Sequence, residues 1–438
     1  MRSGWARAAL VALLLALVAL PQFGRAAQDE PVELLIWDQA PDNPAVSEVI
    51  DSVYAGFTEQ NPNVTIRRET IQNEQLRQTV RTALASGTGP DIIFYDAGPG
   101  YMGVLADAGL IAPLQPFAEE FGWDERIAQS ARNGASYEGE LYGLPLQVDL
   151  IGVYVNTTLM TEAGLETPTT FEEILTFCQD ATAAGYIPFA FANQEGWEAF
   201  HQIAMTGNNM IGPEAMGRLL LENEGRWDSP EMVRAIEAFF VDMRDAGCYS
   251  EDANGINYDD GNALFFGGQA LLHSTGNWLI SDITANMPDY ELEFVPFPPI
   301  EGGAGSFFDT GVGSAYMISA SSPNQEEAAQ FLDYLFSPDV VQRWVAEANY
   351  VVPAEFDIEA VEATPLFRSV LETLAASIAG EEQLGYNIDV LAPPAFNDVM
   401  LNGFQAMLAG DRTAEEQAAA MQAAWDEGMA AGAATPAP

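Results

Sequence analysis

Strand-like apolar runs and helical segments alternate along the first hundred residues of this chain. Residues 32–38 form an apolar run of strand length, and apolar side chains then recur at helical spacing from Val46 to Phe57. Further segments follow in the same order: strand 64–68, helix 72–85, strand 91–95 and helix 100–108. This alternation predicts an α/β fold whose mostly parallel sheet carries helices on both faces.

A second α/β unit follows in the middle of the chain, which at 438 residues is too long for one small core. The predicted segments are strand 150–156, helix 171–184, strand 187–192, a helical region to about 225, helix 230–246, strand 270–274, an extended connector at 294–300, strand 313–319, a helix beginning near Ser322 and a helical part over 397–432. We therefore expect two lobes, each with its own sheet and core.

The first 27 residues have the pattern of a secretory signal peptide. A basic start at Met1-Arg2 precedes an apolar run over residues 8–20, and small residues follow at Gly24–Ala27. The alternative is an uncleaved membrane anchor, although about 13 apolar residues are few for a spanning helix. We expect export to the periplasm or to the extracellular face of the cell membrane.

The charge of the chain excludes several classes of partner. The formal net charge is −48, and removal of the leader would take away Arg2, Arg7 and Arg25 and no acid. Such a field repels nucleic acid and anionic membranes and disfavours anionic ligands. All 16 basic residues are arginine, which excludes lysine-based catalysis.

Cysteine and histidine usage predicts a disulfide and no cofactor. Cys178 and Cys248 are the only cysteines, and in an exported chain pairing is favoured over two buried thiols. His201 and His273 have no partners at metal-ligand spacing. The acidic segment 252–260 fails the EF-hand pattern and is expected to be a solvated turn.

Four short motifs occur in a fixed order along the chain. They are Gly89-Pro-Asp-Ile-Ile-Phe-Tyr95, a Gly143-Leu-Pro loop leading through Asp149 to a strand that ends at Asn156, Gly276-Asn-Trp278, and a Ser322-Pro-Asn helix start leading to Phe331-Leu332. Together they resemble the carbohydrate-binding extracellular solute-binding proteins of ABC importers, the maltose-binding-protein-like group. The resemblance covers nearly all of the chain after the leader.

The resemblance implies the type II periplasmic-binding-protein (Venus-flytrap) fold, in which two lobes joined by hinge strands close on a ligand. It also implies a protein that is not an enzyme, acts as a monomer, and delivers a carbohydrate to a membrane permease with its ATPase. The expected organisation is a signal peptide over 1–27, a first lobe from 28–147 and 301–352, a second lobe from 148–300 and 353–432, and a disordered tail over 433–438.

The resemblance further implies a set of ligand-binding residues. Tyr95 and Trp278 match ligand-stacking aromatics, and Asp149 matches an acid that accepts hydrogen bonds from sugar hydroxyls. Glu195 and Trp197 match a ligand-contacting pair, and Asp38 and Gln39 match polar contacts after the first strand. The alternative for the two tryptophans is core packing, and for Asp149 and Glu195 it is a helix cap or a solvated face. Gly98 stands where the maltose binder has an acid, which argues against maltose.

Three functions are weighed from these residues. A neutral sugar or short oligosaccharide is favoured, because aromatic rings cover its C–H faces and carboxylates accept from its hydroxyls. A polyamine or another cationic solute is the alternative, since acids and aromatics also suit ammonium groups. A secreted glycoside hydrolase would use Asp149 and Glu195 as paired carboxylates, but nothing in a hydrolase calls for the four motifs.

Overall fold

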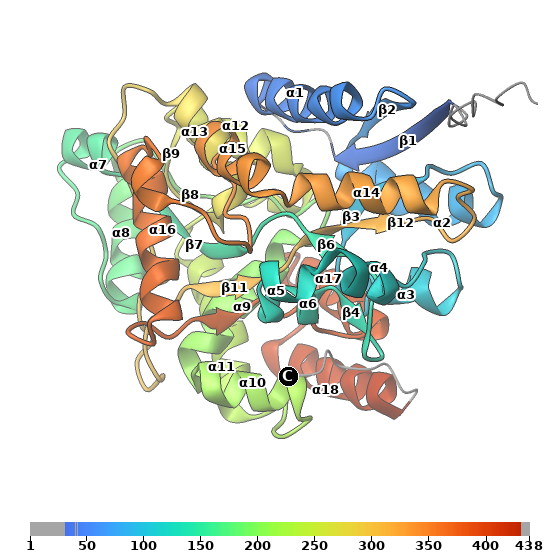
Figure 1. Ribbon diagram of the computed structural model, residues 1–438. Helices are drawn as coiled ribbons and strands as arrows, with labels where there is room; N and C mark the ends of the chain where they lie inside the picture. Colours follow the sequence, from blue (N-terminus) through green and yellow to red (C-terminus); the bar gives the residue numbers. More distant parts are fainter. Residues whose placement is uncertain (1–30, 40, 42, 431–438) are drawn as a thin grey trace, which may run out of the picture.

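The structure is a computed structural model that describes residues 31–39, 41 and 43–430 (Figure 1). The signal peptide expected over 1–27 and the tail expected over 433–438 lie outside the described residues. Within the described part of the chain, no helix combines the length and apolar character needed to cross a membrane. The strands form two main sheets, and each sheet is packed against helices.

The first sheet has five strands in the order β2-β1-β3-β12-β6. β1 pairs in parallel with β2 and β3, whereas β12 runs antiparallel to β3 and β6. The strands are β1 (Val32–Gln39), β2 (Val64–Ile71), β3 (Ile92–Asp96), β6 (Leu144–Pro145) and β12 (Ser314–Ile318). The helices of this part are α1 (Pro44–Gln60), α2 (Asn73–Ala85), α3 (Met102–Asp107), α4 (Gln115–Phe121), α5 (Trp123–Arg126), α6 (Gln129–Gly134), α14 (Gln325–Leu335) and α15 (Pro338–Ala348), with a small hairpin of β4 (Ser136–Tyr137) and β5 (Glu140–Leu141).

Local sequence explains where α1 begins and ends. The Asn43 side chain accepts a hydrogen bond from the amide of Ala45 at 2.9 Å, and Pro44 occupies the first turn. The buried face carries the apolar residues predicted from the spacing, and the amide of Asn61 closes the last turn on the carbonyl of Phe57 at 2.9 Å. This face packs against α14 and α15, as the upper part of Figure 1 shows.

The second sheet has six strands, with β13-β11-β7-β9-β8 in order and β10 also paired with β7. Its strands are β7 (Asp149–Asn156), β8 (Ile187–Ala190), β9 (Ala270–Gly276), β10 (Leu292–Val295), β11 (Asp309–Gly311) and β13 (Gly385–Tyr386). β7 is buried along its whole length and runs antiparallel to β9, β10 and β11. The mostly parallel pairing expected for the first sheet therefore does not extend to this strand of the second sheet. Its neighbours come from distant parts of the chain, and local periodicity does not encode such pairings.

Helices surround the second sheet. They are α7 (Thr157–Ala163), α8 (Phe171–Ala183), α9 (Glu198–Ile211), α10 (Pro213–Leu221), α11 (Pro230–Glu237), α12 (Tyr258–Phe266), α13 (Ile280–Asn286), α16 (Pro365–Ile378), α17 (Pro394–Leu408) and α18 (Ala414–Ala430). The helix expected over 230–246 continues past α11 as a π-helix at Ala238–Met243. Short 3₁₀ turns occupy Ala253–Gly255, Asn277–Leu279 and Ile358–Ala360. A disulfide joins Cys178 of α8 to Cys248.

The chain passes between the two sheets at short segments. It leaves the first sheet between β6 and β7 and returns to it between β11 and β12. The amide of Val148 in the first crossing donates to the carbonyl of Val351 at 2.8 Å. In the second crossing, the carbonyl of Gly313 accepts from the amide of Ala97 at 2.9 Å. Because β11 pairs with β7, the chain returns to the first sheet after Gly311.

Candidate functional site

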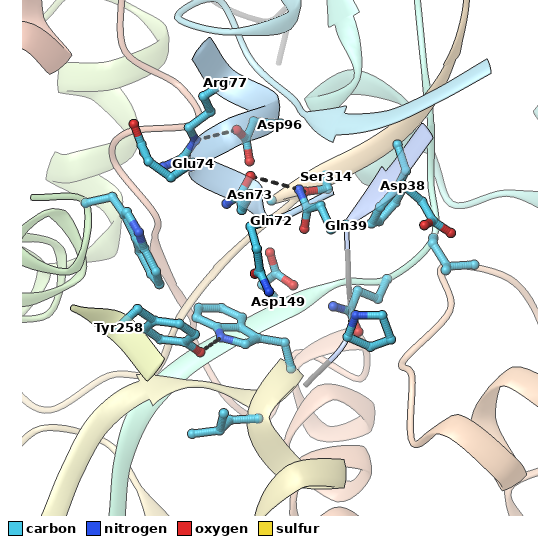
Figure 2. Close-up of a pocket in the computed structure, with 18 of the residues that line it drawn as sticks. Asp38, Gln39, Gln72, Asn73, Glu74, Arg77, Asp96, Asp149, Tyr258 and Ser314 are labelled. Carbon is cyan, nitrogen blue, oxygen red and sulfur yellow. Dashed lines mark hydrogen bonds and ion pairs between the residues drawn. The ribbon is translucent and has the colours of Figure 1, made fainter. Parts of the chain in front are cut away.

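A cavity of about 510 Å³ lies where the two sheets meet. The first sheet contributes the ends of β1 and β3 and the first turn of α2. The second sheet contributes the segment before α9, the start of α12 and the turn after β9. The β11–β12 crossing, the segment 387–390, the crossing between β6 and β7 with the start of β7, and parts of α1 and α13 also line the cavity. The site is thus built from strand ends and helix starts, which is where open α/β folds place their ligands. Figure 2 shows part of this lining.

Four rings form one side of the cavity, and we call them the aromatic wall: Trp197, His201, Tyr258 and Trp278. The ring centroids of Trp197 and Tyr258 lie 4.8 Å apart, and those of His201 and Trp278 lie 5.3 Å apart. The indole N–H of Trp278 donates to the hydroxyl oxygen of Tyr258 at 2.9 Å, the dashed line at the lower left of Figure 2. Burial lowers the pKa of His201 to about 3, so this imidazole is neutral.

The position of Trp278 depends on Gly276 two residues earlier. A Cβ atom at position 276 would lie 1.9 Å from Cζ3 of the Trp278 ring. Only glycine therefore lets the indole lie back over the end of β9. This contact gives the Gly-Asn-Trp motif a physical reason, and it brings Trp278 and Trp197, both expected from the sequence, to the same wall.

Carboxylates line another part of the cavity, and we call Asp96, Asp149 and Asp389 the carboxylate pole. The Arg77 guanidinium donates from Nε to Asp96 at 2.7 Å and lies over the Tyr101 ring, 5.1 Å from its centroid. Burial raises the pKa of Asp149 to about 7 against a hydrogen bond from the backbone of Gly313, and the negative charges of Asp389 and Asp96 add to the rise. In Figure 2, Asp149 lies between Tyr258 and the Arg77–Asp96 pair.

Asp389 takes part in the site although no sequence motif indicated it. Burial raises its pKa to about 6, while the nearby charge of Arg77 acts in the opposite direction. The adjacent Val390 packs against Gly98, where a Cβ atom would lie 2.0 Å from the Val390 carbonyl oxygen. Position 98 also has φ +80°, in the left-handed region. The Val390 backbone leaves no room for a side chain at position 98. Asp389, the residue before Val390, lines the cavity.

Asp38 and Gln39 both line the cavity at the end of β1. Asp38 is only 2 % exposed and accepts from Nε of Arg68 at 2.7 Å, so its main partner is inside the protein. Burial raises the pKa of Asp38 to about 6, although Arg68 opposes the rise. The amide nitrogen of Gln39 lies 3.2 Å from the Ser314 hydroxyl, a link from β1 to the first residue of β12.

The structure does not bring Tyr95 to the cavity. Side chains alternate along a strand, and in β3 it is Phe94 and Asp96 that line the cavity. Tyr95 is buried, and its ring centroid lies 6.4 Å from that of Tyr101 in an edge-to-face arrangement. The expected stacking residue is therefore not among the lining residues, because the motif fixes the strand but not which face points to the cleft.

Glu195 and the acidic segment after residue 252 meet at the aromatic wall. Glu195 lines the cavity, accepts from the amide of Tyr258 at 3.1 Å and has a pKa raised by burial. The segment was expected to be a solvated turn, yet Tyr258 and Asp259 line the cavity. Asn257 caps α12 there by accepting from the amide of Asp260 at 2.8 Å. An asparagine cap before an aromatic residue is the signal that could have placed this helix start.

No group of three or more His, Cys, Asp or Glu side chains in the described part of the chain is arranged to hold a metal ion. His273 serves the core, because its ring nitrogens lie 2.9 Å from the Ala190 carbonyl oxygen and 2.8 Å from Asn262 Oδ1. Arg77, Tyr101, Tyr258, His201 and Asp389 all line the cavity and were not predicted as site residues.

Comparison with known proteins decides the family. The model of the bacterial extracellular solute-binding proteins matches residues 40–342, well over half of the chain. The chain belongs to this family. A related chain is the multiple sugar-binding protein of Streptococcus mutans serotype c (strain ATCC 700610 / UA159), which is 23% identical over 306 residues covering 67% of this chain and 69% of that protein.

Solved structures confirm the two-lobed α/β fold of solute-binding proteins. One, described in work on xylan utilization by the thermophilic bacterium Caldanaerobius polysaccharolyticus, has a TM-score of 0.79 at 23% identity and covers 89% of this chain and 99% of its own. A chitin oligosaccharide binding protein has a TM-score of 0.78 at 22% identity and covers 91% and 99%. At these identities the likeness establishes the fold alone.

Proposed function

We propose that this chain is the substrate-binding protein of an ABC importer and captures a sugar or short oligosaccharide in the cavity between its sheets. The observation that carries the proposal is the aromatic wall and the carboxylate pole lining one cavity. The protein would then deliver the ligand unchanged to a membrane permease with its ATPase. The names of related proteins, which include multiple sugar-binding and chitin oligosaccharide binding proteins, support the same ligand class.

The lining suits the surface of a sugar. Trp197 and Trp278 offer ring faces to the apolar C–H faces of a pyranose, worth ~1 kcal/mol each beyond the area they bury if ring-pair energies transfer. The carboxylates of Asp149 and Asp389 accept from hydroxyl groups, and such charge-assisted bonds contribute about 1.5–3 kcal/mol each. Together with the apolar area that the rings bury, these contacts are of the size needed for micromolar affinity, about −8 kcal/mol.

Closure of two lobes completes the proposal. We assign the crossings 146–148 and 312–313 as hinges, with the first lobe on the β1–β3 side and the second on the β7–β9 side. The second boundary thus moves from 301 to the residues after β11. Closing would exclude water and strengthen each hydrogen bond to the ligand. Export by residues 1–27 to the periplasm or the outer face of the membrane, action as a monomer and avoidance of nucleic acid belong to the same proposal.

A cationic solute is the second candidate, and the composition of the lining favours it. Arg77 is the one arginine among the residues that line the cavity. The lining contains eight acids: Asp38, Glu74, Asp96, Asp149, Glu195, Asp259, Asp282 and Asp389. A ligand with positive charge would reduce the repulsion among these groups. No observation favours the hydrolase, and sugar recovered unchanged after long incubation would exclude it.

A thermal-shift screen tests the proposed function. The protein without its leader would be heated alone and with each member of a panel of mono-, di- and trisaccharides, with putrescine and spermidine as controls. A ligand that binds only the folded state raises the melting temperature, and the rise grows with the logarithm of the ligand concentration above its Kd. We expect at least one sugar to do so. A shift with polyamines alone would select the second candidate, and no shift with any compound would leave the ligand class without support.

A further inference from the structure

Asp389 is a buried acid that lacks a full set of partners. It is 5 % exposed and lines the cavity, and its Oδ1 accepts no hydrogen bond from any residue that the structure describes. The backbone of Asp389 and Val390 hydrogen-bonds to the carboxyl group, but these donors carry no charge. A buried carboxylate oxygen without a donor costs free energy until a donor arrives. The most direct source of that donor is a ligand in the cavity.

The charge next to Asp389 points to the kind of donor. Asp149 is also buried and receives a hydrogen bond from the backbone of Gly313, which carries no charge. The positive charge of Arg77 acts on Asp389, but its Nε hydrogen bond goes to Asp96. The charge of Arg77 thus acts on both Asp96 and Asp389, whereas the donor to Asp149 is uncharged. Burial is the main cause of the raised pKa values of Asp149 and Asp389, and the negative charge of Asp96 adds to both.

Neither a neutral sugar nor a linear polyamine complements both the aromatic wall and the carboxylate pole. A neutral sugar covers the aromatic wall and donates to the carboxylates, but it leaves their charges uncompensated when the cleft closes. A linear polyamine compensates the charge, but it has no flat face for Trp197 and Trp278 and is slender for a cavity of about 510 Å³. In a sugar that carries an ammonium group, the ring can stack on the aromatic wall while the ammonium group donates to the carboxylate pole.

We infer that the ligand is a saccharide bearing a protonated amino group, held by Asp389 and Asp149 while its ring stacks on the aromatic wall. The inference rests on the proposed sugar-binding function and replaces the neutral sugar favoured by the sequence. Asp389 is then the specificity-determining residue, because it lines the cavity and its Oδ1 has no donor among the described residues. Asp149 supplies the second acceptor.

Calorimetric titration with matched ligand pairs tests this inference. Each pair consists of an amino sugar and its hydroxyl parent, such as glucosamine and glucose or galactosamine and galactose, together with their short β-linked oligomers. The members of a pair differ only in the group on C2, so their difference in affinity reports on that group. We expect the amino member to bind about tenfold tighter or better, because its ammonium group adds a Coulombic attraction to the carboxylates that the parent's hydroxyl group lacks. Added salt should weaken binding of the amino member only.

Asp389→Asn is the decisive variant, because it keeps the shape and removes the charge. We expect it to lose the preference within a pair, with affinity for the amino member falling about tenfold and affinity for the parent changing less than about threefold. Glu120→Gln, at an exposed helical position outside the lining, removes the same charge and should leave the preference intact. If Asp389→Asn fails to fold, the salt dependence of the unaltered protein decides.

The outcomes separate the inference from the function on which it rests. Equal affinity within every pair, or tighter binding of the parent, would overturn the ammonium inference and leave sugar binding in place. Binding of spermidine with no amino sugar and no parent sugar would overturn both. A preference for the amino member that disappears in Asp389→Asn supports both.

Discussion

The indole N–H of Trp278 donates a hydrogen bond to the hydroxyl oxygen of Tyr258 at 2.9 Å, so the two rings of the aromatic wall are held by one polar contact. The backbone of Tyr258 is held in turn, because its amide donates to Glu195 at 3.1 Å. A ring fixed in this way loses little freedom when a ligand stacks on it, and such preorganisation favours affinity.

Tyr258→Phe tests the value of this contact. The variant keeps the ring and removes the acceptor, which leaves the Trp278 indole free to rotate. We expect sugar affinity to fall by about three- to tenfold, corresponding to one hydrogen bond of about 0.5–1.5 kcal/mol. The measurement is calorimetric titration. Unchanged affinity would mean that packing alone holds Trp278 in place.

The sequence predicted the elements of the fold better than their arrangement. The helix α1 and the strands β1, β3 and β9 were predicted from the spacing of apolar residues. In the structure, the Asn43 cap marks where α1 begins. The antiparallel pairing of β7 with β10 and β11 could not be predicted, because these strands lie more than a hundred residues away and pair through the return of the chain. Long-range pairing depends on the whole core and not on local preference.

The same division holds for the site. Trp197, Trp278, Asp149, Asp38 and Gln39 line the cavity and were named from motifs near strand ends. Tyr95 was misplaced because a motif does not fix which strand face points to the cleft. Asp389 and Tyr258 were missed because they lie on segments that only the folded chain brings beside the wall and the pole.

Gly98→Ala should destabilise the protein more than a glycine substitution made elsewhere. The new Cβ would meet the Val390 carbonyl oxygen at 2.0 Å, in addition to the strain of φ +80°. Gly109→Ala is the matched control, since Gly109 has φ +64° and open space around its Cβ position. We expect a loss of about 1 kcal/mol for Gly109→Ala and at least about 2 kcal/mol for Gly98→Ala in urea unfolding. Equal losses would show that Val390 does not pack against Gly98.

Asp149 should make the stability of the ligand-free protein depend on pH. Its pKa is raised from 3.8 to about 7 on folding, so the folded state binds more protons than the unfolded state between these values. The free energy of unfolding therefore falls as pH rises through this window. Asp389 and Asp38, with pKa values raised to about 6, act in the same direction, whereas His201 and His273, whose pKa values are lowered, oppose it below about pH 6.5.

Comparison of Asp149→Asn with the unaltered protein isolates this contribution. The melting temperature of the variant, relative to the unaltered protein, should rise by about a few degrees between pH 5 and pH 8. Glu120→Gln should show no such trend. If the difference in melting temperature between Asp149→Asn and the unaltered protein stayed constant across this range, burial would not raise the pKa of Asp149 as stated.

The disulfide between Cys178 and Cys248 closes a sequence separation of 70 residues. Replacing both cysteines with alanine should lower the free energy of unfolding by about 2–4 kcal/mol. Ligand affinity should remain, because neither cysteine lines the cavity. Thiol titration in denaturant gives the direct check. Free thiols before reduction would contradict the disulfide.

Sugar binding on the aromatic wall is the central claim, and calorimetric titration of Trp278→Ala tests it most directly. The unaltered protein, Trp278→Ala and Trp37→Ala would be titrated with the tightest ligand of the sugar panel. Trp37 lies outside the cavity lining and serves as the matched tryptophan control. The account predicts saturable heat at micromolar or tighter affinity for the unaltered protein and for Trp37→Ala, and no detectable binding for a folded Trp278→Ala. Full affinity in Trp278→Ala would contradict it.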